Sequence, residues 1–304
     1  MILIKFHPFY NVMSKKLKKF IFFFNNTSEG RNVMVFNKEI TGYENEEEFA
    51  AYLNGKQVGR VYPNFLELLY KLYGYLDYKD YIECWVNKSK RKADIYIKIN
   101  GYVRGVSIKK GIKNSVHNES ISTLVSFFRE IGISEDIIEK YLFYQYADGT
   151  INGTGKIRIS STLYRENHSK EIAEINEVFN DEKYINAFVN RFILQGTKSE
   201  YEVDAIIYGV VEDFIWITKE EVYYIMRKHL KDEVASLHIS ILTLQPMSRN
   251  LNYNPRYEVC RNLVQVKWYN ISDDIIEVMA FYRNRRLFSS KLITGDIEKE
   301  LVVD

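Results

Sequence analysis

The sequence contains little cysteine, proline or glycine, and each shortage excludes a class of protein. Of 304 residues, two are cysteine, four are proline and 15 are glycine. Cys84 and Cys260 cannot build a disulfide framework or a four-thiolate zinc site, so a reducing cytoplasm is the expected compartment. The scarcity of proline and glycine argues against a collagen-like, linker-like or disordered chain. The sequence therefore predicts a folded protein with a sizeable buried core.

Long hydrophobic runs are also missing. The apolar residues 20–24 follow a lysine-rich stretch, but the run has five residues before it reaches Asn25 and Asn26. A signal peptide needs about 7–15 apolar residues, and a membrane span needs about 20. We therefore expect a strand with a basic flank, and no membrane association.

The chain as a whole has almost no excess of positive or negative charge, but one segment is strongly basic. The 42 Lys and Arg residues nearly balance the 40 Asp and Glu residues, which leaves a net charge of +2. Between residues 88 and 113, however, nine bases accompany one acid, Asp94. Such a local excess is suited to the phosphate backbone of DNA. The bases predicted to contact DNA here are Lys88, Lys90, Arg91, Lys92, Lys110 and Lys113.

A second basic segment lies later in the chain. Arg249, Arg256 and Arg261 are interspersed with asparagine and tyrosine, side chains that suit phosphate and base-edge contacts. Arginine and tyrosine are also enriched at protein interfaces, so a dimer contact is an equal alternative.

The order of predicted elements indicates an α/β (α+β) fold. Residues 1–60 read as a β-rich N-terminal segment. Residues 61–160 predict a helix at 62–74, three strands, a helix beginning at residue 117 and a strand at 156–160. Residues 161–304 read as an α+β region for DNA recognition or dimerisation.

The strongest local signal is a hairpin at Asn100 and Gly101. This dipeptide favours a two-residue turn, so residues whose numbers sum to about 201 should face each other. Asp94 then lies opposite Ser107, and Lys109 shares the face of Ser107 because side chains alternate along a strand. We predict that Asp94, Ser107 and Lys109 converge.

This arrangement resembles the PD-(D/E)xK nuclease superfamily. The resemblance implies a restriction-endonuclease-like core of helix, three-strand meander, helix and strand. It also implies that an aspartate and a second acid hold Mg²⁺ or Mn²⁺, while the lysine activates or positions the attacking water. Here Asp94 and Lys109 match the pattern, Ala93 replaces the proline, and Ser107 replaces the second acid.

The second acid must therefore come from elsewhere. A subgroup of restriction enzymes in this superfamily has a Ser-x-Lys half-motif and takes the acid from the following helix, where Glu119 is expected to lie. The superfamily also uses an acid from the helix before the meander, which makes Glu67 the other candidate.

The resemblance predicts a metal-dependent endonuclease of the restriction or phage-defence type. It would act on double-stranded DNA, as a homodimer, with a cognate methyltransferase or another defence partner. Two alternatives stay open: a nucleic-acid-binding protein on a degraded nuclease fold, and an interaction subunit of a defence complex. A carboxylate near Asp94 would separate the enzyme from the first alternative.

Overall fold

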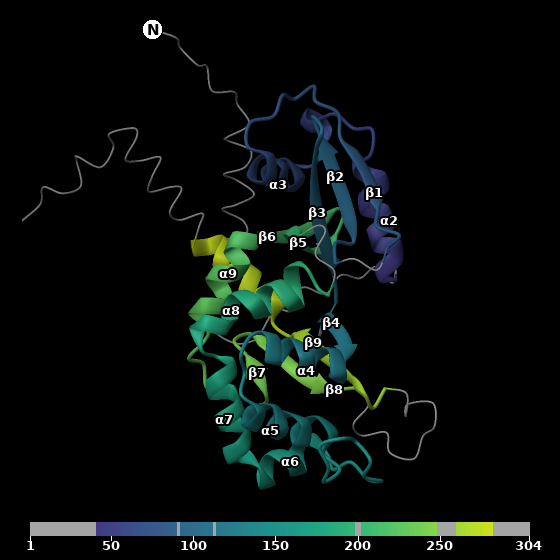
Figure 1. The fold of residues 1–304 in the computed structure, drawn as a ribbon. Coiled ribbons are helices and arrows are strands. Elements are labelled where there is room, and N and C mark those ends of the chain that lie inside the picture. The colour runs from purple at the N-terminus through teal and green to yellow at the C-terminus, as the bar shows by residue number, and fades with distance from the viewer. Residues whose placement is uncertain (1–40, 90–91, 112–113, 198–201, 248–259, 282–304) are drawn as a thin grey trace, which may run out of the picture. The chain divides into compact units, whose positions relative to one another are not determined.

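The computed structural model describes residues 41–89, 92–111, 114–197, 202–247 and 260–281. All of them belong to one compact unit, residues 36–304. Its strands form a five-stranded sheet, in the order β1-β2-β3-β5-β6, and a four-stranded sheet, in the order β4-β9-β8-β7 (Figure 1). Helices pack around both sheets, so the α+β class predicted from the sequence is confirmed.

The first sheet contains the predicted meander. β1 (Glu83–Val86), β2 (Ile95–Ile99) and β3 (Tyr102–Lys109) are antiparallel neighbours. Asn100 and Gly101 both have positive φ, at 51° and 85°, as the predicted two-residue turn requires. Ile95 pairs with Val106, so the register sum of 201 is confirmed.

The strand beside β3 comes from much later in the chain. β5 (Val203–Val210) runs parallel to β3, and β6 (Asp213–Thr218) returns antiparallel to β5. The sheet thus combines strands from both sides of the domain boundary expected at residue 160. A parallel neighbour needs a long crossover, which the intervening helices provide.

The prediction of a strand at 156–160 is wrong, because this segment does not pair with any strand among the described residues. The Arg158 side chain, 5% exposed, instead donates hydrogen bonds to the carbonyls of Tyr146 (2.9 Å) and Gln145 (2.8 Å). A side chain, rather than a backbone ladder, fixes this part of the chain.

The second sheet begins directly after the meander. β4 (Asn114–Ser120) pairs with β9 (Leu263–Trp268), which pairs with β8 (Leu242–Pro246), and β8 pairs with the short β7 (His238–Ile239). All three pairings are antiparallel.

The helix predicted to begin at residue 117 therefore begins later, and its first predicted residues belong to a strand. Residues 117–120 complete β4, and α4 (Ile121–Glu130) begins after Ser120, whose side chain accepts a hydrogen bond from Thr123 N. Ser120 acts as an N-cap, which fixes the helix start four residues later than expected.

The described part of the N-terminal segment is helical, contrary to the β-rich expectation. Residues 1–40 lie outside the described residues. α2 (Gly42–Leu53) begins with a reciprocal capping box, in which Thr41 and Glu44 each bond to the other's backbone. Phe49 and Leu53, four residues apart, are fully buried on one face of this helix.

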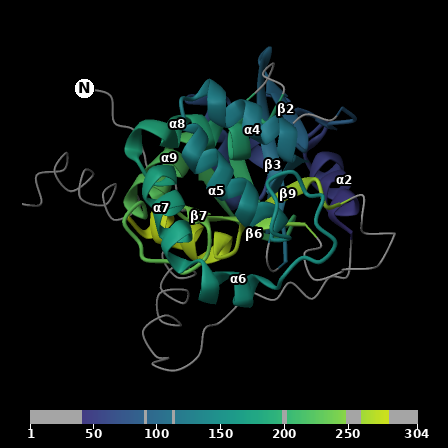
Figure 2. The same ribbon diagram turned by 60° about the horizontal axis from the view of Figure 1, so that its bottom comes forward.

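The remaining helices follow the amphipathic stretches of the sequence. They are α3 (Pro63–Tyr73), α5 (Glu135–Tyr146), α6 (Ser161–Asn167), α7 (Ser169–Phe179), α8 (Glu182–Val189), a π-helical turn η2 (Asn190–Leu194), α9 (Lys219–Lys228) and a helix over residues 271–281. A 3-10 turn, η1 (Val58–Arg60), precedes α3. Figure 2 shows α4, α5, α7, α8 and α9 grouped together. Among the described residues, no helix is long and apolar enough to cross a membrane.

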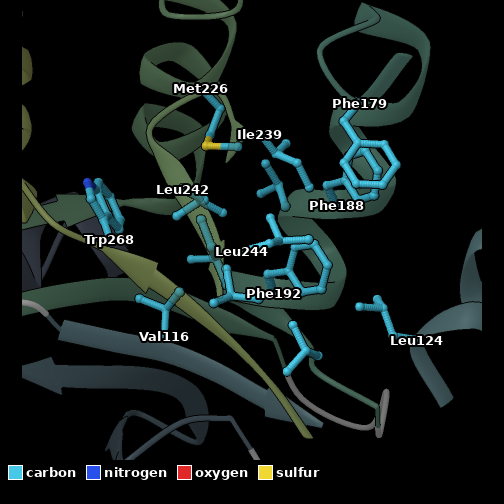
Figure 3. Packing of buried hydrophobic residues seen from close by; sticks show 14 of the residues in the cluster. Val116, Leu124, Phe179, Phe188, Phe192, Met226, Ile239, Leu242, Leu244 and Trp268 are labelled. Atoms are coloured by element: carbon cyan, nitrogen blue, oxygen red, sulfur yellow. The ribbon is translucent and has the colours of Figure 1, made fainter. Parts of the chain in front are cut away.

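Two apolar clusters cover the two faces of the first sheet. Ile95, Ile97 and Ile99 of β2 pack with residues of α2 and α3, whereas Tyr96 between them belongs to the other cluster. That larger cluster also joins the helices to the second sheet. In Figure 3, Phe192 lies close to Leu244, and Phe188 lies close to Phe179.

Candidate active site

The predicted convergence of Asp94, Ser107 and Lys109 is confirmed. Asp94 directly precedes β2, while Ser107 and Lys109 lie near the end of β3. The Oδ2 atom of Asp94 accepts hydrogen bonds from Ser107 Oγ (2.8 Å), Ile108 N (2.6 Å) and Lys109 Nζ (3.0 Å). These donors fix the orientation of the carboxylate.

All three donors use one oxygen of Asp94. Within the described part of the chain, its Oδ1 atom accepts no hydrogen bond. The side chains of Asp94 and Lys109 are each 20% exposed, so solvent and a ligand can reach them. Lys109 Nζ also donates to the carbonyl of Ile108 at 3.0 Å, which holds the ammonium beside the carboxylate.

Helix α2 brings a second carboxylate to this end of the sheet. It packs against β1 and β3, and the buried Asn45 side chain donates to the carbonyl of Gly209 on β5 at 3.0 Å. Glu46 follows Asn45 on α2. Burial and the negative charge of Asp94 raise the pKa of Glu46 to about 7, while the charge of Lys109 lowers it. Asp94 and Glu46 therefore share one electrostatic environment.

Glu46 is the acid that sequence reasoning missed. A usable signal was present, because Thr41-x-x-Glu44 is a capping box and marks a helix start. What the sequence did not indicate is the packing of this helix against β3 and β5. Among the described residues, the Glu46 carboxylate has no hydrogen-bonding or ion-pair partner.

The prediction that Glu119 lies at the start of a helix is wrong. It is part of β4, where its carboxylate forms an ion pair with Arg191 Nη2 (2.5 Å) and lies 3.1 Å from His117 Nε2. Burial would raise the pKa of Glu119, but hydrogen bonds from His117 and Arg191 outweigh it and lower the pKa. Arg191 donates to both oxygens of this carboxylate, which leaves neither oxygen open for a metal.

Glu67, the other candidate, is half-buried on α3. That helix packs against β6 and the 3-10 turn before it. Because the charge of Asp94 contributes, after burial, to the raised pKa of Glu46, α2 offers a further candidate for the second acid beside Glu67 on α3.

Lys92 connects Asp94 to the cluster around Glu119. Its ammonium donates to the carbonyl of Val116 and lies 3.4 Å from His117 Nδ1. Burial, followed by repulsion from Lys109, lowers the pKa of Lys92 to about 7. The Lys92 ammonium is therefore engaged by a backbone carbonyl, whereas the sequence predicted a contact with DNA phosphate.

The other residues predicted to bind DNA have different surroundings. Lys88 is exposed and Lys110 is half-buried. Arg261 forms an ion pair with the buried Asp148 at 2.9 Å and also donates to the carbonyl of Gly155, so it holds the loop of residues 148–155. Five of the residues predicted to bind DNA lie outside the described residues: Lys90, Arg91, Lys113, Arg249 and Arg256.

The donor set near Asp94 suits a hard divalent cation. Mg²⁺ and Mn²⁺ prefer carboxylate oxygens, and Asp94 Oδ1 and the Glu46 carboxylate are such oxygens. Burial, and after it the negative charge of Asp94, raise the pKa of Glu46, and a bound cation would favour the charged carboxylate. Asp94 and Glu46 therefore offer oxygen donors of the kind that such a cation takes.

Comparison with known proteins gives structural similarity but no sequence match. No family model and no curated protein matches the chain. The fold is similar to that in the crystal structure of the restriction endonuclease MspI in complex with its cognate DNA. The similarity has a TM-score of 0.44 at 17% sequence identity, and it covers 67% of this chain and 76% of that chain.

Proposed function

We propose that this chain is a metal-dependent DNA endonuclease. The observation that carries the proposal is the Asp94 carboxylate, which is held through Oδ2 by Ser107, Ile108 and Lys109 and shares its environment with Glu46. A fixed carboxylate, a second acid and a lysine ammonium together form a site for hydrolysing phosphodiester bonds.

The metal-binding residues would be Asp94 and Glu46. A bound Mg²⁺ or Mn²⁺ supplies a positive charge that stabilises the charge developing on the phosphate oxygens. Ser107 does not provide a ligand. Its hydroxyl donates to Asp94 Oδ2, so we assign it a positioning role that holds the carboxylate in place.

Lys109 would hold and orient the attacking water. Its Nζ atom is fixed between Asp94 Oδ2 and the Ile108 carbonyl, both at 3.0 Å, and an ammonium has three donors. The remaining donor can bind the water oxygen. That oxygen forms a new bond to phosphorus while the bond from phosphorus to one sugar oxygen breaks; the attacking water gives up a proton to solvent, and the departing sugar oxygen takes one up.

The biological role that fits is restriction or phage defence, with double-stranded DNA as substrate. Exposed bases such as Lys88, next to the hairpin, would contact the phosphate backbone without reading bases. A homodimer would cut both strands, and a cognate methyltransferase or another defence partner would protect host DNA.

Cleavage of a supercoiled plasmid tests the proposal. The full chain should nick or linearise DNA with Mg²⁺ or Mn²⁺ and should be inactive with EDTA. Lys109→Ala should abolish cleavage yet keep DNA binding, whereas Lys98→Ala is the matched control, because Lys98 lies on β2 in an exposed pair with Glu83 at 2.9 Å. A Lys109→Ala protein that cuts as fast as the parent under single-turnover conditions would overturn the assignment.

The alternative function is DNA binding without catalysis. Ser107 favours it, because loss of the second acid is also how a nuclease becomes inactive. Measurements of DNA binding and DNA cleavage separate the two proposals. An enzyme would bind and cut DNA with Mg²⁺ or Mn²⁺, whereas the alternative expects DNA binding by the parent protein and no cleavage with any metal.

A further inference from the structure

A second cluster of metal-binding side chains lies away from Asp94. His229 directly follows α9 as its C-cap, while Asp274 and Glu277 lie three residues apart on the helix over residues 271–281. One ligand atom from each residue lies within 4.8 Å of the others. Two segments distant in sequence thus bring one imidazole and two carboxylates together.

The two ring nitrogens of His229 have different surroundings. Nδ1 lies 2.6 Å from Asp232 Oδ2, while Nε2 is buried and has no hydrogen-bonding partner among the described residues. A metal-binding histidine usually donates its other N–H to a carboxylate, which directs the free lone pair at the metal. Asp232 occupies that position here, so Nε2 presents its lone pair towards Asp274 and Glu277.

Each carboxylate keeps one oxygen for a ligand. Asp274 accepts the indole N–H of Trp268 through Oδ2 at 2.5 Å, and Glu277 accepts Lys228 through Oε1. The second oxygen of Glu277, Oε2, faces His229 Nε2 at 3.6 Å. The Trp268 and Lys228 contacts therefore orient the two carboxylates and leave the remaining oxygens open.

The spacing matches a small tetrahedral ion. Zinc bonds to histidine nitrogen and carboxylate oxygen are about 2.0–2.2 Å long, which puts neighbouring ligand atoms about 3.4 Å apart. The 3.6 Å between His229 Nε2 and Glu277 Oε2 is close to that value. One nitrogen with two oxygens is a donor set that zinc accepts, with water as the fourth ligand.

We propose that His229, Asp274 and Glu277 form a Zn²⁺ site that joins the end of α9 to the helix over residues 271–281. Asp232 is the positioning residue for the imidazole. The ordinary alternative is an ion-pair network in which a protonated His229 contacts Asp232 and Glu277. A proton and a metal compete for the same Nε2 atom. A Zn²⁺ site therefore predicts that the protein binds zinc, whereas the ion-pair network predicts that it does not.

Zinc binding by the full chain tests this proposal. The Asp94→Asn, Glu46→Gln protein removes the proposed nuclease metal ligands and serves as the parent. After chelation and dialysis, calorimetry with Zn²⁺ should show one bound ion per chain, and Co²⁺ should give the absorption bands of a four-coordinate site. Zinc at about 100 times its dissociation constant should raise Tm by about 5–10 °C.

The variants separate this site from other metal ligands. His229→Ala should weaken zinc binding by about 100-fold or more and remove the Tm increase, and Asp232→Asn should weaken binding by about 10–100-fold. His168→Ala is the matched control, because His168 pairs with one glutamate side chain, Glu171 at 3.4 Å, and stacks on Tyr164.

The half-exposed Glu277 provides a second variant if His229→Ala does not fold. Glu277→Gln should also lose zinc binding while keeping the apoprotein folded. The proposal is overturned if the parent binds no zinc, or if zinc binds Glu277→Gln and the control protein with equal affinity. Neither result bears on DNA cleavage at Asp94, so the two proposals can fail separately.

Discussion

At the scale of single residues, the candidate active site combines residues of one hairpin with a glutamate, Glu46, that lies about 50 residues earlier in the sequence. Asp94, Ser107 and Lys109 meet because a two-residue turn fixes the register, and the sequence alone sufficed to predict this. Glu46 could not be predicted, because its position depends on a buried hydrogen bond between residues 164 positions apart, Asn45 and Gly209.

Glu46→Gln tests the second metal ligand. We expect the substitution to weaken Mg²⁺ or Mn²⁺ binding and to slow cleavage at a fixed metal concentration, because a carboxylate oxygen is replaced by a neutral amide. Cleavage rates measured across a metal titration give the apparent affinity. Glu47→Gln is the matched control, since Glu47 is exposed on the same helix turn. Equal metal dependence in both variants would exclude Glu46 as a ligand.

The raised pKa of Glu46 predicts a pH dependence of metal binding. The pKa is raised to about 7, so in the metal-free protein the stability that the protonated group contributes is complete below its ordinary pKa of 4.5 and is lost as pH rises towards 7. Metal binds the deprotonated form. The Tm increase caused by Mn²⁺ should therefore grow between pH 5 and about 7.5, as measured by thermal unfolding, and should lose this dependence in Glu46→Gln.

At the scale of elements, the sequence predicted local pairs and missed distant ones. The hairpin at 94–109 was predicted because its turn is short, and α3 was predicted from its proline start and glycine end. The last strand of the core was wrongly predicted at 156–160, and the strand that pairs with β3 was not predicted, since a parallel neighbour leaves no short-range signal. The true neighbour, β5, begins almost 100 residues after Gly105, its partner on β3.

Asn45→Ala tests whether α2 positions the active site. Loss of the buried hydrogen bond to Gly209 should reduce the free energy of unfolding by about 1–2 kcal/mol and should also lower cleavage, because Glu46 loses its anchor. The matched control is Asn64→Ala, which removes a similar 3.0 Å bond from α3 to the carbonyl of Phe214. Denaturant unfolding and single-turnover cleavage are the measurements. If the control slows cleavage as much, the effect is general destabilisation.

At the scale of the whole molecule, the balanced net charge makes any DNA affinity a local property. The excess of nine bases over one acid between residues 88 and 113 is visible in the sequence, yet the structure divides these bases into different roles. Lys109 belongs to the candidate active site, the Lys92 ammonium donates to a backbone carbonyl, and Lys88 faces solvent. The sequence gives the number of charges, whereas burial decides which of them can reach a phosphate.

This division predicts which bases control the salt dependence of DNA binding. In an Asp94→Asn background, which prevents cleavage, replacing Lys88, Lys90 and Arg91 with alanine should weaken binding to all duplex sequences. The slope of log affinity against log salt should become shallower by about 0.9 for each phosphate that the protein no longer neutralises. Lys92→Ala should leave the slope unchanged and instead lower Tm, because its ammonium bonds to a backbone carbonyl inside the protein. Fluorescence anisotropy across a salt series measures the slope. A shallower slope for Lys92→Ala, with no change for the triple variant, would show that the buried lysine is the one that reaches DNA.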